Sequence, residues 1–288
     1  MVAGLGGGVK DQTILPRAAL VGSSPGAIMA DECLFVADGA EFEPTQWAVG
    51  PWSADTLQGS AYGGLLVRTL ERGDPAPGMI LARLSFDFWR PVTRERLVPT
   101  VTVLREGRKA RTVEASLSQA GKAVARCTAV YLKADPSSNP ASAGPAAPAR
   151  GPEVGRPIPA HVKAWSPFFT GVDTRVVDGD LLKPGPAAAW FNLTRPLVAG
   201  EETAPFVHAV SAADLASGIS AIVDLRAWSF INADLTVLFW RVPRPPWILL
   251  DAETRVGDRG TGVAWGLLSD LDGAFGSCAQ TLVFEPRR

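Results

Sequence analysis

The sequence is poor in the residues that build metal centres and disulfide frameworks. It has three cysteines and two histidines among 288 residues. The cysteines are odd in number and far apart, so they provide neither a disulfide framework nor a paired metal-binding motif. The two histidines have no metal-ligand spacing. We therefore expect no metal and no cofactor, and a reducing, cytoplasmic location.

An excess of charge of one sign is also missing. The chain carries 28 Lys and Arg against 29 Asp and Glu, a net charge of -1, whereas proteins that bind nucleic acid usually have a clustered basic excess. No apolar run approaches the ~20 residues that a membrane helix needs. With 47% hydrophobic residues, the composition predicts a globular protein of one large or two small domains, with neither nucleic acid nor membrane as a partner.

Composition divides the chain into four segments. Residues 1–30 are rich in glycine and have poor periodicity, which predicts a mobile N-terminal tail; Met29 is a credible alternative translation start, which N-terminal sequencing of the native protein would test. Residues 134–160 form a Pro/Ala/Gly-rich linker that cannot bury enough apolar area to order itself. The linker separates a first unit, residues 31–133, from a second, residues 161–288.

The two units repeat one pattern. Phe88-Trp89-Arg90 matches Phe239-Trp240-Arg241, and Cys127 matches Cys278, both at a spacing of 151 residues. Each copy is rich in β-branched and aromatic residues and has turn signals at Arg105-Glu106-Gly107, at Ala120-Gly121-Lys122 or at Asp272-Gly273. These signals predict antiparallel strands joined by hairpins, and the glycine-rich residues 255–262 are one further hairpin.

A helix is expected before the strands of each copy. The first covers residues 53–73, with Ser53 or Asp55 as the cap, and the second covers residues 204–218 and ends at Gly218. Glycines at 59, 63 and 64 should weaken the first helix by ~1 kcal/mol each, but they let a sheet approach it closely. We therefore predict an α+β fold, a double hot-dog: two tandem units, each with a curved antiparallel sheet wrapped around a central helix.

Three positions differ in chemistry between the copies. At the spacing of 151 residues the polar residue is always in the second copy: Asp214 against Gly63, Asn232 against Leu81, and Gln280 against Ala129. One carboxylate and two carboxamides can hold a water molecule and take its proton, as attack on an activated acyl carbonyl requires. We interpret these three residues as candidate catalytic residues.

Each of the three also has a purely structural explanation. Asp214 could cap a helix, Asn232 could be a turn residue, and Gln280 could face water from an edge strand. Strand alternation counted from Leu235 puts Asn232 on the opposite face, unless a strand end or bulge re-aims it. Gln280 shares its face with apolar residues, so we expect it to be buried.

Other catalytic arrangements fit less well. Cys127 and Cys278 are interpreted as small core residues. A hot-dog enoyl hydratase would need an Asp and His pair, but His208 and Asp214 lie six residues apart on one helix and face different directions. His208 is interpreted as a surface or interface residue.

Several segments resemble the acyl-CoA thioesterase II family of double hot-dog thioesterases. They are AYGGLLVRTLE at residue 61, SFDFWRPV at 85, LREGRKARTVEASLSQAGKAVARCTA at 104, LFWRVP at 238 and DGAFGSCAQTLVF at 272. The resemblance covers most of the chain after Asp31 except the linker. It implies hydrolysis of an acyl-CoA by a water molecule held by an Asp, a Ser or Thr, and a Gln. Asp214 and Gln280 match two of these positions, and Asn232 occupies the hydroxyl position, a departure from the family.

The resemblance also implies a substrate-binding segment. Backbone N–H groups around Gly63 and Gly64, next to Tyr62, would polarise the thioester carbonyl. The predicted function is therefore a cytoplasmic acyl-CoA thioesterase, a metal-free hydrolase of fatty acid metabolism. The alternative is a non-catalytic acyl-CoA binding or regulatory protein. A homo-oligomer, the acyl chain length, and the choice between CoA and acyl carrier protein remain open at this stage.

Overall fold

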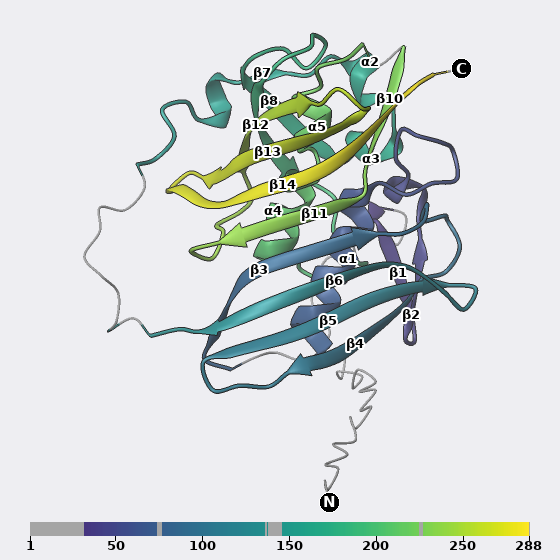
Figure 1. The fold of residues 1–288 in the computed structure, drawn as a ribbon, viewed down its shortest axis with the longest axis vertical. Coiled ribbons are helices and arrows are strands. Elements are labelled where there is room, and N and C mark those ends of the chain that lie inside the picture. The colour runs from purple at the N-terminus through teal and green to yellow at the C-terminus, as the bar shows by residue number, and fades with distance from the viewer. Residues whose placement is uncertain (1–31, 74–76, 136, 138–145, 225–226, 288) are drawn as a thin grey trace, which may run out of the picture.

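The computed structural model describes residues 32–73, 77–135, 137, 146–224 and 227–287 (Figure 1). The predicted N-terminal tail and Met29 lie outside the described residues. Among the described residues, no helix is long and apolar enough to cross a membrane.

Most strands join one long antiparallel sheet in the order β4-β5-β6-β3-β11-β14-β13-β12-β9-β8-β7, and β10 also pairs with β14 (Figure 1). A separate pair, β1 and β2, packs near the β4 edge. The strands are β1 Phe35–Asp38, β2 Glu41–Pro44, β3 Met79–Phe88, β4 Val98–Arg105, β5 Ala110–Gln119, β6 Lys122–Lys133, β7 Arg156–Pro157, β8 Val172–Asp178, β9 Ala187–Leu193, β10 Trp228–Asn232, β11 Asp234–Phe239, β12 Ile248–Val256, β13 Thr261–Asp270 and β14 Gly273–Pro286.

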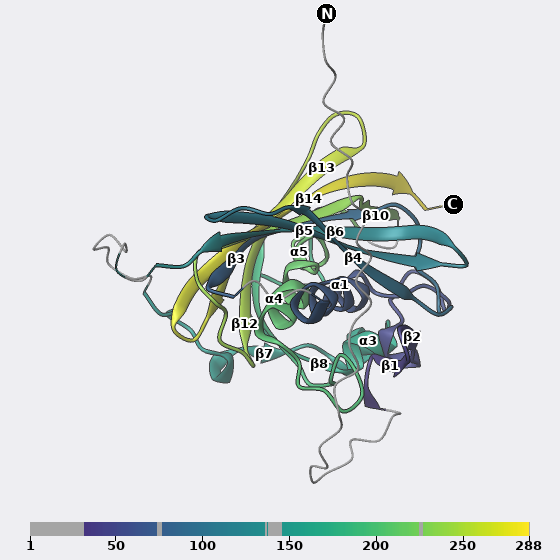
Figure 2. The ribbon, with the colours of Figure 1, turned by 90° about the horizontal axis from the view of Figure 1, so that it is seen from below.

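The sheet curves over two helices that lie side by side, α1 and α4 (Figure 2). α1 contacts strands of the first half, β4, β5 and β6, and α4 contacts strands of the second half, β9, β12 and β13. The helices are α1 Gly59–Gly73, α2 Ala160–Lys163, α3 Pro167–Thr170, α4 Pro205–Ala213 and α5 Ala216–Ile219, with 3-10 turns at Gln46–Ala48 and Pro152–Val154.

Residues 151 apart in sequence meet at the centre of the molecule. Ser60 Oγ donates to the carbonyl of Ser211 at 2.9 Å, and Ser211 Oγ donates to the carbonyl of Ser60 at 3.4 Å. Ser85 of β3 pairs with Thr236 of β11. Such reciprocal contacts arise when equivalent elements are related by a two-fold axis, so the two halves pack as a pair of similar structures.

The predicted hairpins are present, but the predicted start of the first helix and the predicted end of the second helix were wrong. Residues before Gly59 do not enter α1, because Leu57 N–H donates to Val92 and Gln58 N–H donates to Ala48. Ser53 and Asp55 are therefore not its cap. In the second half α4 ends at Ala213 and α5 follows, so Gly218 lies inside α5.

The glycines of α1 allow close contact with the other helix and not, as predicted, mainly with the sheet. A Cβ on Gly64 would lie 3.1 Å from Val207 of α4, and one on Gly63 would lie 3.5 Å from Val210. The absence of side chains at these positions lets the two helix backbones approach.

Part of the predicted linker is ordered. Residues 152–154 form a 3-10 turn, and β7 pairs with β8 at the edge of the sheet. The indole of Trp190, which is fully buried, donates to the carbonyl of Arg150 at 2.9 Å and holds this segment against the sheet. A composition-based prediction misses such an anchor because its partner lies 40 residues away.

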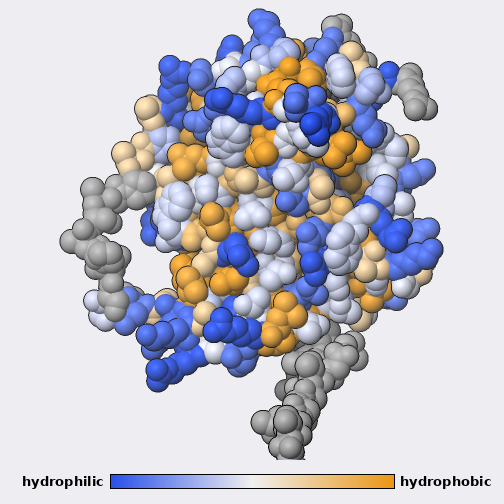
Figure 3. All heavy atoms as spheres, viewed as in Figure 1, coloured by the Kyte–Doolittle hydropathy of each residue, from blue (hydrophilic) through white to orange (hydrophobic). Residues whose placement is uncertain are grey.

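The outer face of the second half is apolar. Leu238, Val263, Trp265, Leu267 and Val283 are all more than a third exposed and come from β11, β13 and β14. Figure 3 shows hydrophobic surface on this side of the molecule. Contiguous apolar surface of this kind is typical of contact faces.

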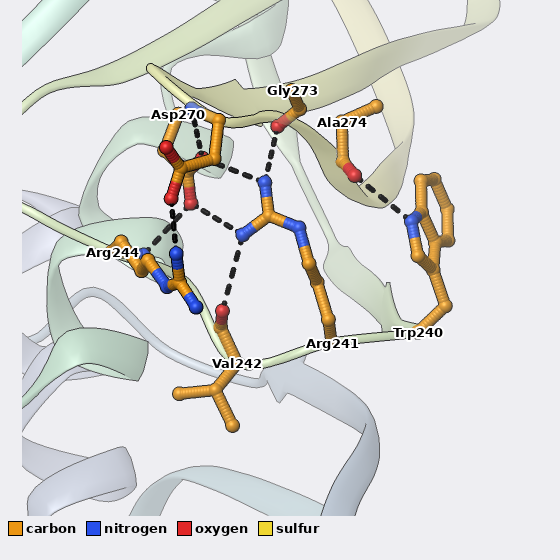
Figure 4. Close-up of polar contacts among 8 residues, drawn as sticks. Trp240, Arg241, Val242, Arg244, Asp270, Gly273 and Ala274 are labelled. Atoms are coloured by element: carbon orange, nitrogen blue, oxygen red, sulfur yellow. Dashed lines mark hydrogen bonds and ion pairs between the residues drawn. The ribbon is translucent and has the colours of Figure 1, made fainter. Parts of the chain in front are cut away.

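An ion pair fastens the turn after β13 to the end of β11 (Figure 4). Both carboxylate oxygens of Asp270, which is fully buried, accept from the Arg241 guanidinium at 2.6 Å, and the Arg244 N–H donates to Asp270 at 2.8 Å. Burial alone would raise the pKa of Asp270, but these donors hold it below its usual value. The pair therefore acts as a charged clasp between the two segments.

Candidate active site

A cavity of about 940 Å³ opens between the start of α1, the α4–α5 turn and β10. Its size is typical of small-molecule sites. Eight aromatic residues line it: Trp52, Tyr62, Phe88, Trp89, Trp165, Phe169, Phe191 and Phe230. Among the described residues, its charged lining consists of Asp214, Arg90 and Arg287. A single carboxylate therefore faces a largely apolar space.

Asp214 follows the last residue of α4 and is 6% exposed. One carboxylate oxygen, Oδ2, accepts from Gln58 Nε2 at 3.1 Å and from Ser60 Oγ at 3.0 Å. The other, Oδ1, accepts from Asn232 Nδ2 at 3.2 Å. The carboxylate of the second half is thus held largely by the start of α1 in the first half: Gln58, which directly precedes the helix, and Ser60 in its first turn.

The pKa of Asp214 is raised above its usual value because the carboxyl group is buried. The donors Ser60, Gln58 and Asn232 lower the pKa and offset part of this effect. A carboxylate with a raised pKa is a better proton acceptor than an exposed one. The site therefore combines a fixed carboxylate with an increased affinity for a proton.

Asn232 reaches Asp214 because the strand is interrupted. Asn232 pairs with Leu282 at the end of β10, whereas Thr236 of β11 pairs with Ala279, so four residues of this strand span three of β14. Such a bulge reverses the direction of the side chains that precede it. Simple alternation from Leu235 fails for this reason.

Gln280 is buried, at 1% exposure, and supports the segment that carries Asp214. Its Nε2 donates to the Asp214 carbonyl at 3.0 Å, and its Oε1 accepts from the Ser217 N–H at 3.1 Å. Asp214 and Ser217 line the cavity, whereas Gln280 does not. One side-chain amide thereby fixes the turn between α4 and α5 to β14.

We expect Gln280→Leu to lower the free energy of unfolding by about 2 kcal/mol, because it leaves a buried N–H and a buried carbonyl without partners. Chemical denaturation would measure this effect. Thr69→Val, which removes a buried hydroxyl from α1 that binds within its own helix, is a control with a smaller expected loss. Equal stability of wild type and Gln280→Leu would contradict this role.

Of the three substrate-binding residues predicted from the sequence, one lines the cavity and two do not. Tyr62 lines the cavity. Gly63 and Gly64 lie in the second turn of α1 against α4 and are not part of the lining. His208 is also absent from the lining, and burial lowers its pKa to about 4.

Sequence reasoning missed the first turn of α1. Gln58 and Ser60 bind the carboxylate, and Gly59 lies so close that a Cβ there would be 2.7 Å from both carboxylate oxygens. The contacts span more than 150 residues. Their only sequence signal is that three small or polar residues, 58–60, stand at the start of the helix.

Among the described residues, no group of three or more His, Cys, Asp or Glu side chains is placed to bind a metal ion. Cys127 and Cys278 are buried, as predicted for core residues, and burial raises the pKa of both thiols.

Solved structures share this fold. A candidate thioesterase II from Thermobifida fusca YX matches with a TM-score of 0.70 and 18% identity, covering 93% of this chain and 100% of that one. A hot-dog protein of unknown function from Alicyclobacillus acidocaldarius matches at 0.69 and 15%, covering 90% and 98%. Acyl-CoA thioesterase II of Mycobacterium marinum matches at 0.61 and 19%, covering 84% and 97%. The protein therefore has a hot-dog fold of the thioesterase type.

Sequence profiles assign the family. The profile of the acyl-CoA thioesterase N-terminal domain matches residues 48–132, and that of the acyl-CoA thioesterase C-terminal domain matches residues 142–284. The chain belongs to the acyl-CoA thioesterase family. A search of curated proteins found no significant match.

Proposed function

We propose that this protein is a double hot-dog enzyme that hydrolyses acyl-CoA to a free acid and CoA at the cavity beside Asp214. The observation that supports this most is a buried carboxylate, fixed by donors from both halves, on the wall of a large apolar cavity. The cavity would hold the acyl chain, and the carboxylate would activate water beside the thioester.

In the proposed reaction Asp214 is the general base. Side chains of Gln58, Ser60 and Asn232 and the Ser60 N–H bind the carboxylate, and each carboxylate oxygen has two lone pairs, so acceptor capacity for water remains on the carboxylate. It takes a proton from the water while the water oxygen forms a bond to the thioester carbon and the carbonyl electron pair moves onto oxygen. When the tetrahedral intermediate collapses, the C–S bond breaks and the CoA sulfur receives the proton from Asp214.

Asn232 and Gln280 have supporting roles in this proposal. Asn232, at the position of the family's hydroxyl residue, orients the carboxylate through Nδ2, and its remaining donor and acceptor sites can orient the water. Gln280 is assigned a role in fixing the turn that carries Asp214, because both ends of its amide bind that turn.

The oxyanion donor is assigned to the start of α1. N–H groups inside a helix donate to carbonyls four residues earlier, which would occupy those of Gly63 and Gly64. At the start of α1 the Ser60 N–H binds Asp214, and the Ala61 and Tyr62 N–H groups donate to the Gln58 carbonyl. The donor is therefore assigned to the Gly59 N–H, at a position that lines the cavity beside Asp214. One donor of this kind contributes ~3 kcal/mol to lowering a barrier.

Thiol release from short, medium and long acyl-CoA substrates tests the proposal. Turnover by the purified protein that rises and falls with chain length would support hydrolysis in this cavity. Saturable binding of acyl-CoA with no thiol release would instead support the alternative, a non-catalytic acyl-CoA binding or regulatory protein.

We expect Gln58→Leu to move the acidic limb of the pH profile of kcat/KM to higher pH and to lower the plateau about tenfold. Gln58 stabilises the ionised carboxylate, so its loss raises the pKa of Asp214. The nearby titratable groups are Tyr62 and Cys278; burial raises the pKa of both, that of Cys278 to about 12, so neither titrates in this range. A reduced plateau with an unmoved limb would show that Gln58 acts only structurally.

A further inference from the structure

The two copies of the Trp-Arg pair have different surroundings. In the second half Trp240 and Arg241 are bound to the β13–β14 turn: the indole Nε1 donates to the Ala274 carbonyl at 3.0 Å, and the guanidinium binds Asp270 and the Gly273 carbonyl (Figure 4). Both side chains point toward this turn, so they are occupied by structural contacts.

In the first half the equivalent acid is missing. The position that matches Asp270 is Gln119, whose Oε1 accepts from the Thr93 N–H at 3.1 Å and whose Nε2 donates to the carbonyls of Thr93 and Glu95. In the first half the neutral amide of Gln119 therefore holds the loop around Thr93 and Glu95. Oε1 also accepts from Thr93 Oγ1 at 3.4 Å, so both of its lone pairs are used. It has none left for a guanidinium, which has only donors.

Trp89 and Arg90 therefore lack the contacts that hold Trp240 and Arg241, and the Arg126 guanidinium lies over one face of the Trp89 ring, 5.1 Å from its centroid. Neither side chain has a hydrogen bond or ion pair to another residue in the described part of the chain, and both line the cavity. Trp89 is 49% exposed and Trp52, also in the lining, is 48% exposed, so these residues lie at its open end. Arg90 is therefore a cation on the cavity wall beside these two exposed indoles.

We propose that Arg90, beside the exposed indole of Trp89, binds a phosphate group of the CoA moiety of the substrate. A guanidinium presents paired donors that match phosphate oxygens, and an exposed indole offers a flat apolar surface next to it. The proposal rests on the acyl-CoA activity proposed above. It places the acyl chain among the inner aromatic residues of the cavity and the anionic CoA moiety at Arg90.

Three thioesters that share one acyl group but carry a progressively shorter thiol moiety test this assignment: acyl-CoA, acyl-4′-phosphopantetheine and acyl-pantetheine. We expect Arg90→Gln to raise KM for acyl-CoA about tenfold, to leave kcat within twofold, and to leave KM for the phosphate-free acyl-pantetheine unchanged. A rise in KM for acyl-4′-phosphopantetheine would place Arg90 at that phosphate; a rise for acyl-CoA alone would place it at the phosphates of the nucleotide. Equal KM values of wild type and Arg90→Gln for acyl-CoA would overturn the proposal.

Two further variants separate charge from structure. Arg90→Lys keeps the charge and should recover part of the affinity, whereas Arg105→Gln removes an exposed arginine of β4 outside the cavity and should leave KM unchanged. If the wild type hydrolyses no acyl-CoA, the proposed activity fails, and calorimetric titration with CoA decides the present proposal alone. Tenfold weaker CoA binding by Arg90→Gln would support it, and equal or absent binding in both proteins would refute it.

Discussion

Asp214→Asn is expected to reduce kcat for acyl-CoA hydrolysis by a factor of a hundred to ten thousand, the usual contribution of a general base. The amide has nearly the shape of the carboxyl group but cannot accept the proton from water. Its donor and acceptor ends can both be satisfied, because Ser60 Oγ can donate or accept and the Asn232 amide can be reversed. Steady-state thiol release would measure the loss, and near-wild-type turnover would rule out Asp214 as the base.

The same variant should be more stable than the wild type at alkaline pH. Burial raises the pKa of Asp214 in the folded state, so the folded protein favours the protonated form, and stability falls as pH rises from the unfolded pKa through the folded pKa. The amide is neutral throughout. The difference in melting temperature should therefore grow in favour of Asp214→Asn as the pH is raised from acid toward pH 8.

Gly59→Ala is expected to lower kcat/KM about a hundredfold. The added Cβ would lie 2.7 Å from both oxygens of Asp214 and 2.9 Å from its Cγ, so the carboxylate must move. A displacement of about 1 Å at a reacting group has an effect of this size. The protein should remain folded, since alanine is a better helix former than glycine.

Gly257→Ala is the matched control for Gly59→Ala. It adds the same methyl group in the β12–β13 hairpin, where the nearest atom, the Thr261 carbonyl oxygen, is 3.5 Å away, and it should leave kcat/KM unchanged. If Gly59→Ala kept full activity, the carboxylate would have to be mobile, and the proposed role of the first turn of α1 in holding it would be wrong.

The repeat and its hairpins could be predicted because both are local or periodic features of the sequence. The spacing of 151 residues alone identified Asp214, Asn232 and Gln280 as positions where the copies differ. The direction of Asn232 could not be predicted, because it depends on a one-residue bulge against β14. Strand alternation contains no information about such a shift.

The first turn of α1 was missed for another reason. Gln58 was not a candidate because its partner, Asp214, is 156 residues away and belongs to the other half. Comparison of equivalent positions identifies the polar residues that only one copy has, but it does not show which residues of the other copy contact them. The same limit applies to Trp89 and Arg90: the difference between their surroundings and those of Trp240 and Arg241 depends on Gln119, which is distant in sequence.

The contacts across the central axis also show what a single chain allows that two identical chains would not. Gly59 faces Asp214, and one helical turn away Gly63 faces Val210. These four residues are two pairs of equivalents at the spacing of 151 residues, so the two contacts are equivalent to each other. In a symmetric dimer an acid at this position would appear twice, and the residue facing it would have to be glycine in both copies. Joining the halves in one chain lets one of these two equivalent contacts hold a buried charge while the other is apolar.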